Sequence, residues 1–290
     1  MSNKKIAFCF LIYDQIENED LWHAFFSLAD KHMYNIYIHY KINKPLFFLE
    51  EYKLPECIDT KYADVSLIHA QNNLFRYAYE HDPENYKFIL LSDSCIPLKS
   101  FDTIYNKLTL TNKGFLNICP SIQCFPNCDS LLEYFPREYI GKASQWIILN
   151  RILIEKMVYI KPETIQFIFE PIYAPEEIYY HTIIKLNQFE NEIETTPNLA
   201  ECATTFVNWE GMKYKYVSKK GIRNYNEITI EEMVHLLYSP CLFGRKFMRN
   251  CKITEMEDIY ISDFIFPFFQ KSNNSGTPNP LPFALNAESG

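Results

Sequence analysis

The chain has 290 residues, of which 48% are hydrophobic and 22% charged, a composition that is ordinary for a globular protein with a sizeable core. Its formal net charge is −8 at pH 7, whereas proteins that bind nucleic acids through phosphates normally carry an excess of positive charge. The composition therefore argues against a nucleic-acid-binding protein. The 9 cysteines are scattered without a Cys-x-x-Cys pair, so we expect reduced core residues rather than a zinc site.

The first apolar run, residues 6–13, is too short to span a bilayer and lacks a signal-peptide cleavage pattern. No other segment of the sequence reaches the length of a membrane helix. We therefore expect a soluble, cytoplasmic protein without a signal peptide or membrane anchor.

The first half of the chain alternates between strand-like and helix-like patterns. Apolar runs predict strands at residues 6–13, 34–39, 88–91, 115–118 and 145–149, and amphipathic spacing predicts helices at 19–29 and 65–80. This alternation favours an α/β fold, a Rossmann-type three-layer sandwich with a mostly parallel central sheet. Ligands of such sheets gather beyond the carboxyl ends of the strands.

The second half is less regular. It contains amphipathic helix patterns at residues 178–186, introduced by Pro175, and at 228–237. Residues 271–290 are rich in Asn, Ser, Pro and Gly, which is typical of a flexible polar tail. Because no repeat or linker is visible, we expect one domain over residues 1–270 and a tail over 271–290.

The 7 glycines fit neither the Gly-x-Gly-x-x-Gly pattern of dinucleotide-binding turns nor the phosphate loop of P-loop proteins. The chain also lacks His-Glu-x-x-His and Gly-x-Ser-x-Gly motifs. Nicotinamide enzymes, P-loop nucleotide hydrolases and the hydrolases with those motifs are therefore not expected. A parallel sheet without glycine phosphate loops favours an enzyme that uses a sugar nucleotide.

A candidate site loop, Ser92-Asp93-Ser94-Cys95, follows the predicted strand at 88–91. Sugar-nucleotide enzymes commonly hold the diphosphate through a metal bound by an Asp-x-Asp pair at such a position. Here Cys95 stands where the second carboxylate would be, and one carboxylate is a poor site for a hard divalent cation. On spacing alone, Asp93 is equally a ligand or the cap of a turn or helix.

Five stretches of the chain, taken in order, resemble one known family. They are 66–70 with Leu74, 88–98 with Phe101, Gly141-Lys-Ala-Ser-Gln-Trp146 with Asn150-Arg151, Tyr173-Ala-Pro-Glu-Glu177 with Tyr180 and Thr182, and Leu242-Phe-Gly-Arg-Lys-Phe247. Together they resemble the core-2/I-branching β-1,6-N-acetylglucosaminyltransferase-like family, glycosyltransferase family 14, and within it the plant-like and bacterial branch.

The resemblance implies a GT-A-like fold and an inverting transfer of a sugar, N-acetylglucosamine or xylose, from a UDP-sugar to a glycan hydroxyl. It also implies that no metal or other cofactor is needed, because basic side chains replace the cation on the diphosphate. The partners would be the nucleotide-sugar donor and a glycan or glycoconjugate acceptor.

The same resemblance makes Glu177 the base that takes the proton of the acceptor hydroxyl. Arg245 and Lys246 would meet the charge of the leaving diphosphate. With the residues placed near them, the candidate donor or nucleotide contacts are Tyr13, Asp14, Asp93, Ser94, Arg245 and Lys246. The candidate acceptor contacts are Glu138, Ser144, Trp146 and Trp209.

Simpler explanations stay open for several of these residues. Pro175-Glu176-Glu177 is also an ordinary first helical turn, with acidic residues at the positive end of the helix dipole. Arg245 and Lys246 also fit a solvated basic pair, the two tryptophans also fit the core, and the basic stretch 213–223 is typical of a surface loop.

The chain departs from the family pattern at four positions, where the family has Asp, His, Trp and Glu. The residues here are Glu176, Ile178, Tyr62 and Gln71, and no His-Pro follows Trp209. Two alternatives therefore remain. One is a catalytically degenerate member with a binding or structural role, and the other is a metal-dependent transferase that uses Asp93.

Overall fold

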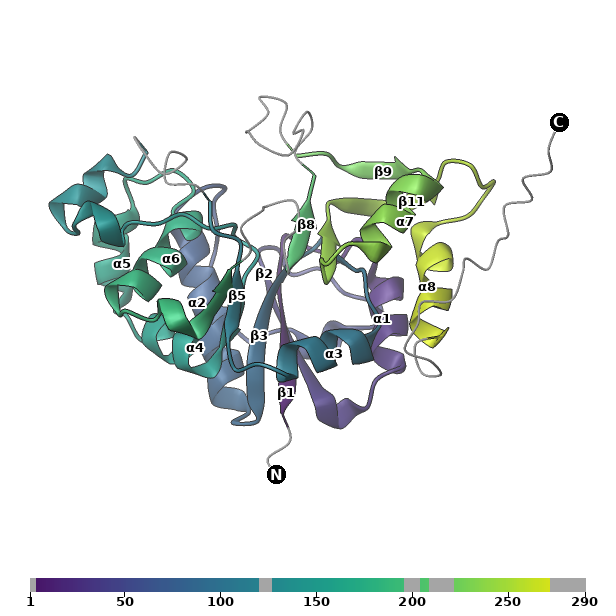
Figure 1. The fold of residues 1–290 in the computed structure, drawn as a ribbon, viewed down its shortest axis with the longest axis horizontal. Helices are drawn as coiled ribbons and strands as arrows, with labels where there is room; N and C mark the ends of the chain where they lie inside the picture. The colour runs from purple at the N-terminus through teal and green to yellow at the C-terminus, as the bar shows by residue number, and fades with distance from the viewer. Residues whose placement is uncertain (1–3, 120–126, 196–203, 209–221, 272–290) are drawn as a thin grey trace.

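A six-stranded sheet forms the centre of the computed structural model, which describes residues 4–119, 127–195, 204–208 and 222–271 (Figure 1). In spatial order its strands are β2 (Tyr34–Tyr40), β1 (Lys5–Ile12), β3 (Asn85–Ser92), β6 (Ile148–Asn150), β5 (Gly114–Leu116) and β7 (Ile193–Thr195). β1 is parallel to β2 and β3, and β5 is parallel to β7, whereas β6 runs antiparallel to β3 and β5. The sheet is therefore mostly parallel, as predicted, with one reversed strand among those described.

The central strands are apolar because both faces of the sheet are covered. In β1, Phe8 and Phe10 pack into the core on one face, while Ala7 and Cys9 pack into the core on the other. Side chains of a strand alternate between faces, so two cores require an uninterrupted apolar run. This confirms the interpretation of residues 6–13 as a doubly buried strand.

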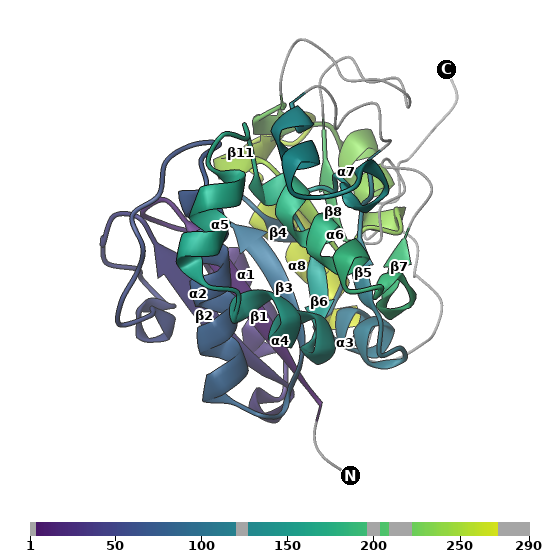
Figure 2. The same ribbon diagram turned by 90° about the vertical axis from the view of Figure 1, so that its left-hand side faces the viewer.

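Helices form one layer on each face. Figure 2 shows α2 (Ser66–His81), α4 (Arg151–Val158), α5 (Pro162–Phe169) and α6 (Glu176–Leu186) in front of the sheet. The opposite core contains buried residues of α1 (Glu19–Ser27), α3 (Phe101–Thr109), α7 (Ile230–Tyr238) and α8 (Ile261–Lys271). This is the three-layer α/β architecture that the sequence predicts.

Two small sheets lie above the end of the central sheet where β1 and β3 finish (Figure 1). One has the order β4 (Ile96–Pro97), β10 (Phe243–Arg245) and β8 (Thr205–Val207), and the other pairs β9 (Tyr225–Ile228) with β11 (Phe247–Ile253). They bring the C-terminal part of the chain to the edge at which ligands of parallel sheets bind.

The second half is more regular than predicted, because α4, α5 and α8 were not expected. Local signals explain two helix starts: the Asn150 side chain accepts a hydrogen bond from the Leu153 N–H at 2.8 Å, and Pro162 opens α5. The short 3₁₀ helices are η1 (Lys31–Met33), η2 (Glu50–Tyr52), η4 (Asp129–Glu133), η5 (Arg137–Tyr139) and η6 (Glu190–Glu192).

α8 ends at Lys271, the first residue of the predicted tail, and residues 272–290 lie outside the described part of the chain. The single domain over 1–270 and the flexible tail stay predictions. Within the ranges that the structure describes, no helix has both the length and the apolarity needed to cross a membrane.

Candidate functional site

The predicted nucleotide contacts Tyr13 and Asp14 lie where β1 and β2 end. The Tyr13 carbonyl accepts hydrogen bonds from the N–H groups of Ile42 at 2.8 Å and Lys41 at 3.1 Å. The Lys41 ammonium lies 5.6 Å from the centre of the Tyr13 ring, and Asp14 forms an ion pair with Lys44. Because Tyr13 is 54% exposed, its ring has a free face beside these two lysines.

The loop at residues 92–95 is fixed by its backbone. The Glu17 N–H donates to the Asp93 carbonyl at 2.9 Å, and the Phe247 N–H donates to the Ser94 carbonyl at 2.9 Å. The Ser94 side chain is buried, with its Oγ 3.3 Å from the Ser92 Oγ. These bonds hold the loop against Phe247, which directly follows the basic pair at residues 245–246.

Gly244 allows this close approach. It pairs with Ile96 in the small sheet, and a Cβ atom at position 244 would lie 3.2 Å from the Phe247 ring and 3.3 Å from the Leu98 side chain. A larger residue at this position would require the Phe247 and Leu98 side chains to shift by a few tenths of an ångström.

Arg245 is buried and stacked on Trp146. Its exposed fraction is 8%, and its guanidinium carbon lies 4.0 Å from the centre of the indole ring. Burial lowers the pKa of Arg245, while the nearby Cys95 and Asp93 oppose that change. The Nε atom is buried and has no hydrogen-bond partner among the described residues. A buried guanidinium with an unused donor is costly unless an anion binds there.

Lys246 adds a second cationic group at the same place. Burial lowers the pKa of its ammonium group first, the charge of Arg245 lowers it further, and Asp93 opposes both. A bound dianion would stabilise the charged forms of both Arg245 and Lys246. The pair therefore fits a diphosphate, and not only a solvated surface pair.

Glu177 lies in the first turn of α6 and forms an ion pair with Lys142, with 2.9 Å between Nζ and Oε2. Both side chains are 25% exposed, so the carboxylate can meet a ligand. The Ala143 N–H donates to the Glu177 carbonyl at 2.8 Å. Gly141 packs closely against α6. A Cβ atom at position 141 would lie 2.3 Å from Nδ1 of His181, so a larger residue would clash with that side chain.

The segment 142–146 connects the candidate base to the candidate diphosphate site. Lys142 pairs with Glu177 at one end, and the Trp146 ring supports Arg245 at the other. Between them, the Ser144 N–H donates to the Asn117 carbonyl at 2.8 Å, and the Ser144 Oγ accepts from the Trp146 N–H at 3.4 Å. The structure thus brings together residues from distant parts of the sequence.

Glu176, which the sequence places in a helix start and at a departure from the family pattern, is the most perturbed carboxyl group described near this segment. It is 6% exposed, and its Oε2 atom is buried without a hydrogen-bond partner among the described residues. Burial raises its pKa to about 7, with a further contribution from the Glu177 charge. Nothing in the residue spacing distinguishes Glu176 from Glu177, so this could not be found from the sequence.

The other departures from the family pattern are placed in different environments. Ile178 is buried in the core, and Gln71 is fully buried in α2 with no described hydrogen-bond partner for its amide. Tyr62, in contrast, is 89% exposed.

The structure does not bring all of the candidate acceptor contacts together in one place. Glu138 is exposed in η5, next to α6, whereas Trp146 is 6% exposed with Arg245 against its ring. Trp209 and most of the basic stretch lie outside the described residues. Arg223, at the end of that stretch, forms an ion pair with Glu232 at 2.7 Å.

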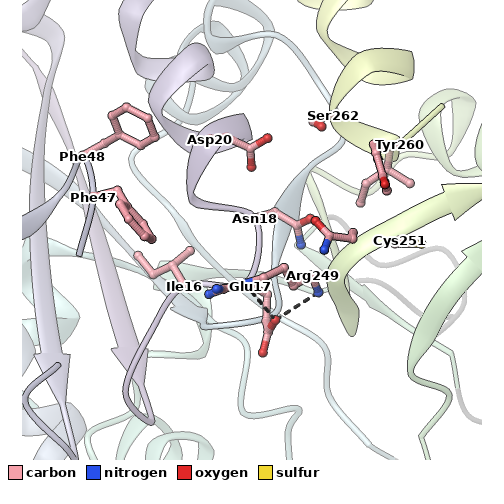
Figure 3. Close-up of a pocket in the computed structure, with 12 residues that line it drawn as sticks. Ile16, Glu17, Asn18, Asp20, Phe47, Phe48, Arg249, Cys251, Tyr260 and Ser262 are labelled. Carbon is pink, nitrogen blue, oxygen red and sulfur yellow. Dashed lines mark hydrogen bonds and ion pairs between the residues drawn. The ribbon is translucent and has the colours of Figure 1, made fainter. Parts of the chain in front are cut away.

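A pocket of about 220 Å³ opens beside the loop at residues 92–95, at the N-terminal ends of α1 and α8 (Figure 3). Glu17 and Asn18 form part of its wall; the Glu17 carboxylate accepts from the Arg249 N–H at 3.0 Å, and the Asn18 amide donates to the Phe247 carbonyl at 3.0 Å. None of the predicted site residues lines this pocket. Its wall therefore supports the loop at residues 92–95 from outside the candidate site.

The described ranges contain no cluster of three or more His, Cys, Asp or Glu side chains that could hold a metal ion. Asp93 stands where a metal-dependent enzyme would have the first residue of its Asp-x-Asp pair. Its charge raises the pKa values of both Arg245 and Lys246, so these two cations lie close to it.

The sequence profile of the family described as "Branch: Core-2/I-Branching enzyme" matches residues 6–236. Glycosyltransferase BC10 of Oryza sativa subsp. japonica is 25% identical over 159 residues, which cover 51% of this chain and 39% of that protein. The chain thus spans only 39% of the length of this curated relative.

Among solved structures, the apo WbbM bifunctional glycosyltransferase aligns with 84% of this chain and 46% of its own, at 10% identity and a TM-score of 0.44. The galactosyltransferase LgtC, in complex with donor and acceptor sugar analogues, aligns with 69% of this chain and 75% of its own, at 8% identity and a TM-score of 0.37. The profile match covers most of the sequence, and the chain therefore belongs to the Core-2/I-Branching enzyme family.

Proposed function

We propose that this protein is a glycosyltransferase that moves a sugar from a UDP-sugar to a glycan hydroxyl, with inversion at the anomeric carbon and without a metal ion. Family membership supports the reaction class. The observation that carries the proposal is the segment 142–146, which contacts Glu177 at one end and Arg245 at the other. N-acetylglucosamine and xylose are the donor sugars to test first.

In this proposal, Glu177 is the general base. The acceptor oxygen attacks the anomeric carbon, its proton passes to the Glu177 carboxylate, and the bond from the anomeric carbon to the diphosphate oxygen breaks. A neutral hydroxyl is a weak nucleophile, so removal of its proton in the transition state is needed for a useful rate. The ion pair with Lys142 holds the carboxylate in one direction. One in-line displacement of this kind inverts the anomeric centre.

Arg245 and Lys246 accept the charge that develops on the leaving diphosphate. Fixed cations in a partly buried site stabilise such charge more than they would in water. The indole of Trp146 holds the guanidinium in place, and a guanidinium can donate several hydrogen bonds to phosphate oxygens. These two cations take the part that a metal plays where an Asp-x-Asp pair is present.

A thermal-shift screen tests donor binding directly. UDP, UDP-N-acetylglucosamine and UDP-xylose should raise the melting temperature of the wild-type protein, whereas GDP- and TDP-sugars should do so less, because a ligand that binds the folded state stabilises it more the higher its concentration is relative to its Kd. Arg245→Met should remove the UDP-dependent shift. Arg76→Met, a change at an exposed arginine of α2, is the matched control and should keep it. An unshifted wild type with every nucleotide sugar would count against the proposal.

A further inference from the structure

Two exposed tyrosines lie next to each other beside Glu177. Tyr62 precedes α2 and is 89% exposed, and Tyr173 precedes α6 and is 63% exposed. A side-chain hydrogen bond with Tyr173 is the main cause of the raised pKa of the Tyr62 phenol, and the charges of Glu176 and Glu177 raise that pKa further. The pair therefore belongs to the same surface as the candidate base.

A backbone hydrogen bond joins the two segments that carry the tyrosines. The Ala174 N–H donates to the Ala63 carbonyl at 3.1 Å, so the residues that follow the two tyrosines are hydrogen-bonded together. Ala63 and Ala174 have φ values of 54° and 52°, in the left-handed region that costs an alanine about 1 kcal/mol. Such conformations persist where the surrounding structure holds them, and they are concentrated at ligand sites.

We propose that Tyr62 and Tyr173 form an aromatic platform on which a pyranose ring of the acceptor glycan stacks during transfer. This inference rests on the proposed glycosyltransferase function. A pyranose has a face of C–H groups that packs on an aromatic ring, and its hydroxyl edge can bond to the two phenols. The sugar on the platform is the acceptor, because the platform adjoins the base, while the donor's diphosphate belongs at Arg245.

The test uses Tyr62→Ala, Tyr173→Ala and Tyr62→Trp, with Tyr238→Ala as control because Tyr238 is 53% exposed on α7. The probes are the methyl β-glycosides of galactose, glucose, xylose, N-acetylglucosamine and glucuronic acid. Binding is measured by saturation-transfer NMR without donor, and the acceptor KM is measured in transfer from UDP-N-acetylglucosamine and UDP-xylose.

Each alanine variant should raise the acceptor KM roughly tenfold, more than it changes the donor KM, because one ring contact is lost. Tyr62→Trp should retain binding of the glycosides, and Tyr238→Ala should match the wild type.

Transfer by the wild type with unchanged acceptor KM in both alanine variants would overturn the platform and leave the transferase proposal standing. Tyrosine-dependent glycoside binding without transfer from any UDP-sugar would support the platform as a sugar-binding site and overturn the transferase proposal. Absence of both binding and transfer would overturn both.

Discussion

The ammonium nitrogen of Lys142 lies 2.9 Å from a carboxylate oxygen of Glu177, and this ion pair joins the segment 142–146 to the first turn of α6. The same segment carries Trp146, whose ring supports Arg245. The two ends of the proposed reaction, proton removal and departure of the diphosphate, are thus connected through one short stretch of chain.

Lys142→Met should lower kcat by about ten- to a hundredfold with a smaller effect on the donor KM, because a carboxylate that is no longer held in place meets the acceptor hydroxyl in fewer productive geometries. Steady-state kinetics with varied donor gives both constants. Lys142→Arg should recover part of the loss. The control is Lys252→Met, which removes an exposed ion pair with Asp258 and should leave the rate unchanged. Equal kcat values for Lys142→Met and the wild type would show that Lys142 does not position the Glu177 carboxylate.

Arg245→Lys should lower kcat/KM for the donor by about a hundredfold, although it keeps the charge. A lysine lacks the planar guanidinium that stacks on Trp146 and donates several hydrogen bonds to phosphate oxygens. The measurement is the dependence of initial rate on donor concentration, with Arg76→Lys on α2 as the matched change. A rate for Arg245→Lys close to that of the wild type would show that this guanidinium does not contact the diphosphate.

Glu176 should make the stability of the protein depend on pH. Burial raises its pKa from 4.5 to about 7 in the folded state, so the folded protein holds this proton more tightly than the unfolded chain. The resulting contribution to the free energy of unfolding is complete below pH 4.5, falls as pH rises from there through about 7, and amounts to about 3 kcal/mol.

Glu176→Gln should therefore lose less stability than the wild type between about pH 5 and about pH 8 in urea unfolding. Glu170→Gln, at an exposed site just before this helix, is the control and should follow the wild type. The same pH dependence in Glu176→Gln and the wild type would contradict a raised pKa at Glu176.

Chelation should leave the initial rate nearly unchanged if cationic side chains take the place of a metal. The experiment compares UDP release before and after treatment with EDTA and again after addition of Mn²⁺ or Mg²⁺. A loss of activity that either metal restores would instead favour a metal-dependent transferase with Asp93 as a ligand.

Much of the fold could be predicted from local sequence pattern. The strands β1, β2 and β3 and the helices α1, α2 and α6 were all expected near their observed positions, because an apolar run or an amphipathic stripe is a local property. The short strands β5 and β6 were placed less well. Their bounds depend on pairing between distant residues, such as Phe115 with Ile148.

Individual site residues could be predicted from the sequence, but the contacts between them could not. The family resemblance identified Glu177 and Arg245 as candidates. No spacing rule could reveal that Glu177 forms an ion pair with Lys142 or that Arg245 stacks on Trp146. The burial of Glu176 and the contact between Tyr62 and Tyr173 also depend on how α2 and α6 are placed beside each other. Such contacts arise only when separate elements pack together.

The release of UDP from UDP-N-acetylglucosamine and UDP-xylose, compared between the wild type, Glu177→Gln and the exposed control Glu170→Gln, tests the central claim most directly. We predict that the wild type and the control release UDP, and that Glu177→Gln does so at least about a hundredfold more slowly with an unchanged melting temperature. Release at the same rate by the wild type and Glu177→Gln, or no release by the wild type from any sugar nucleotide, would contradict the account.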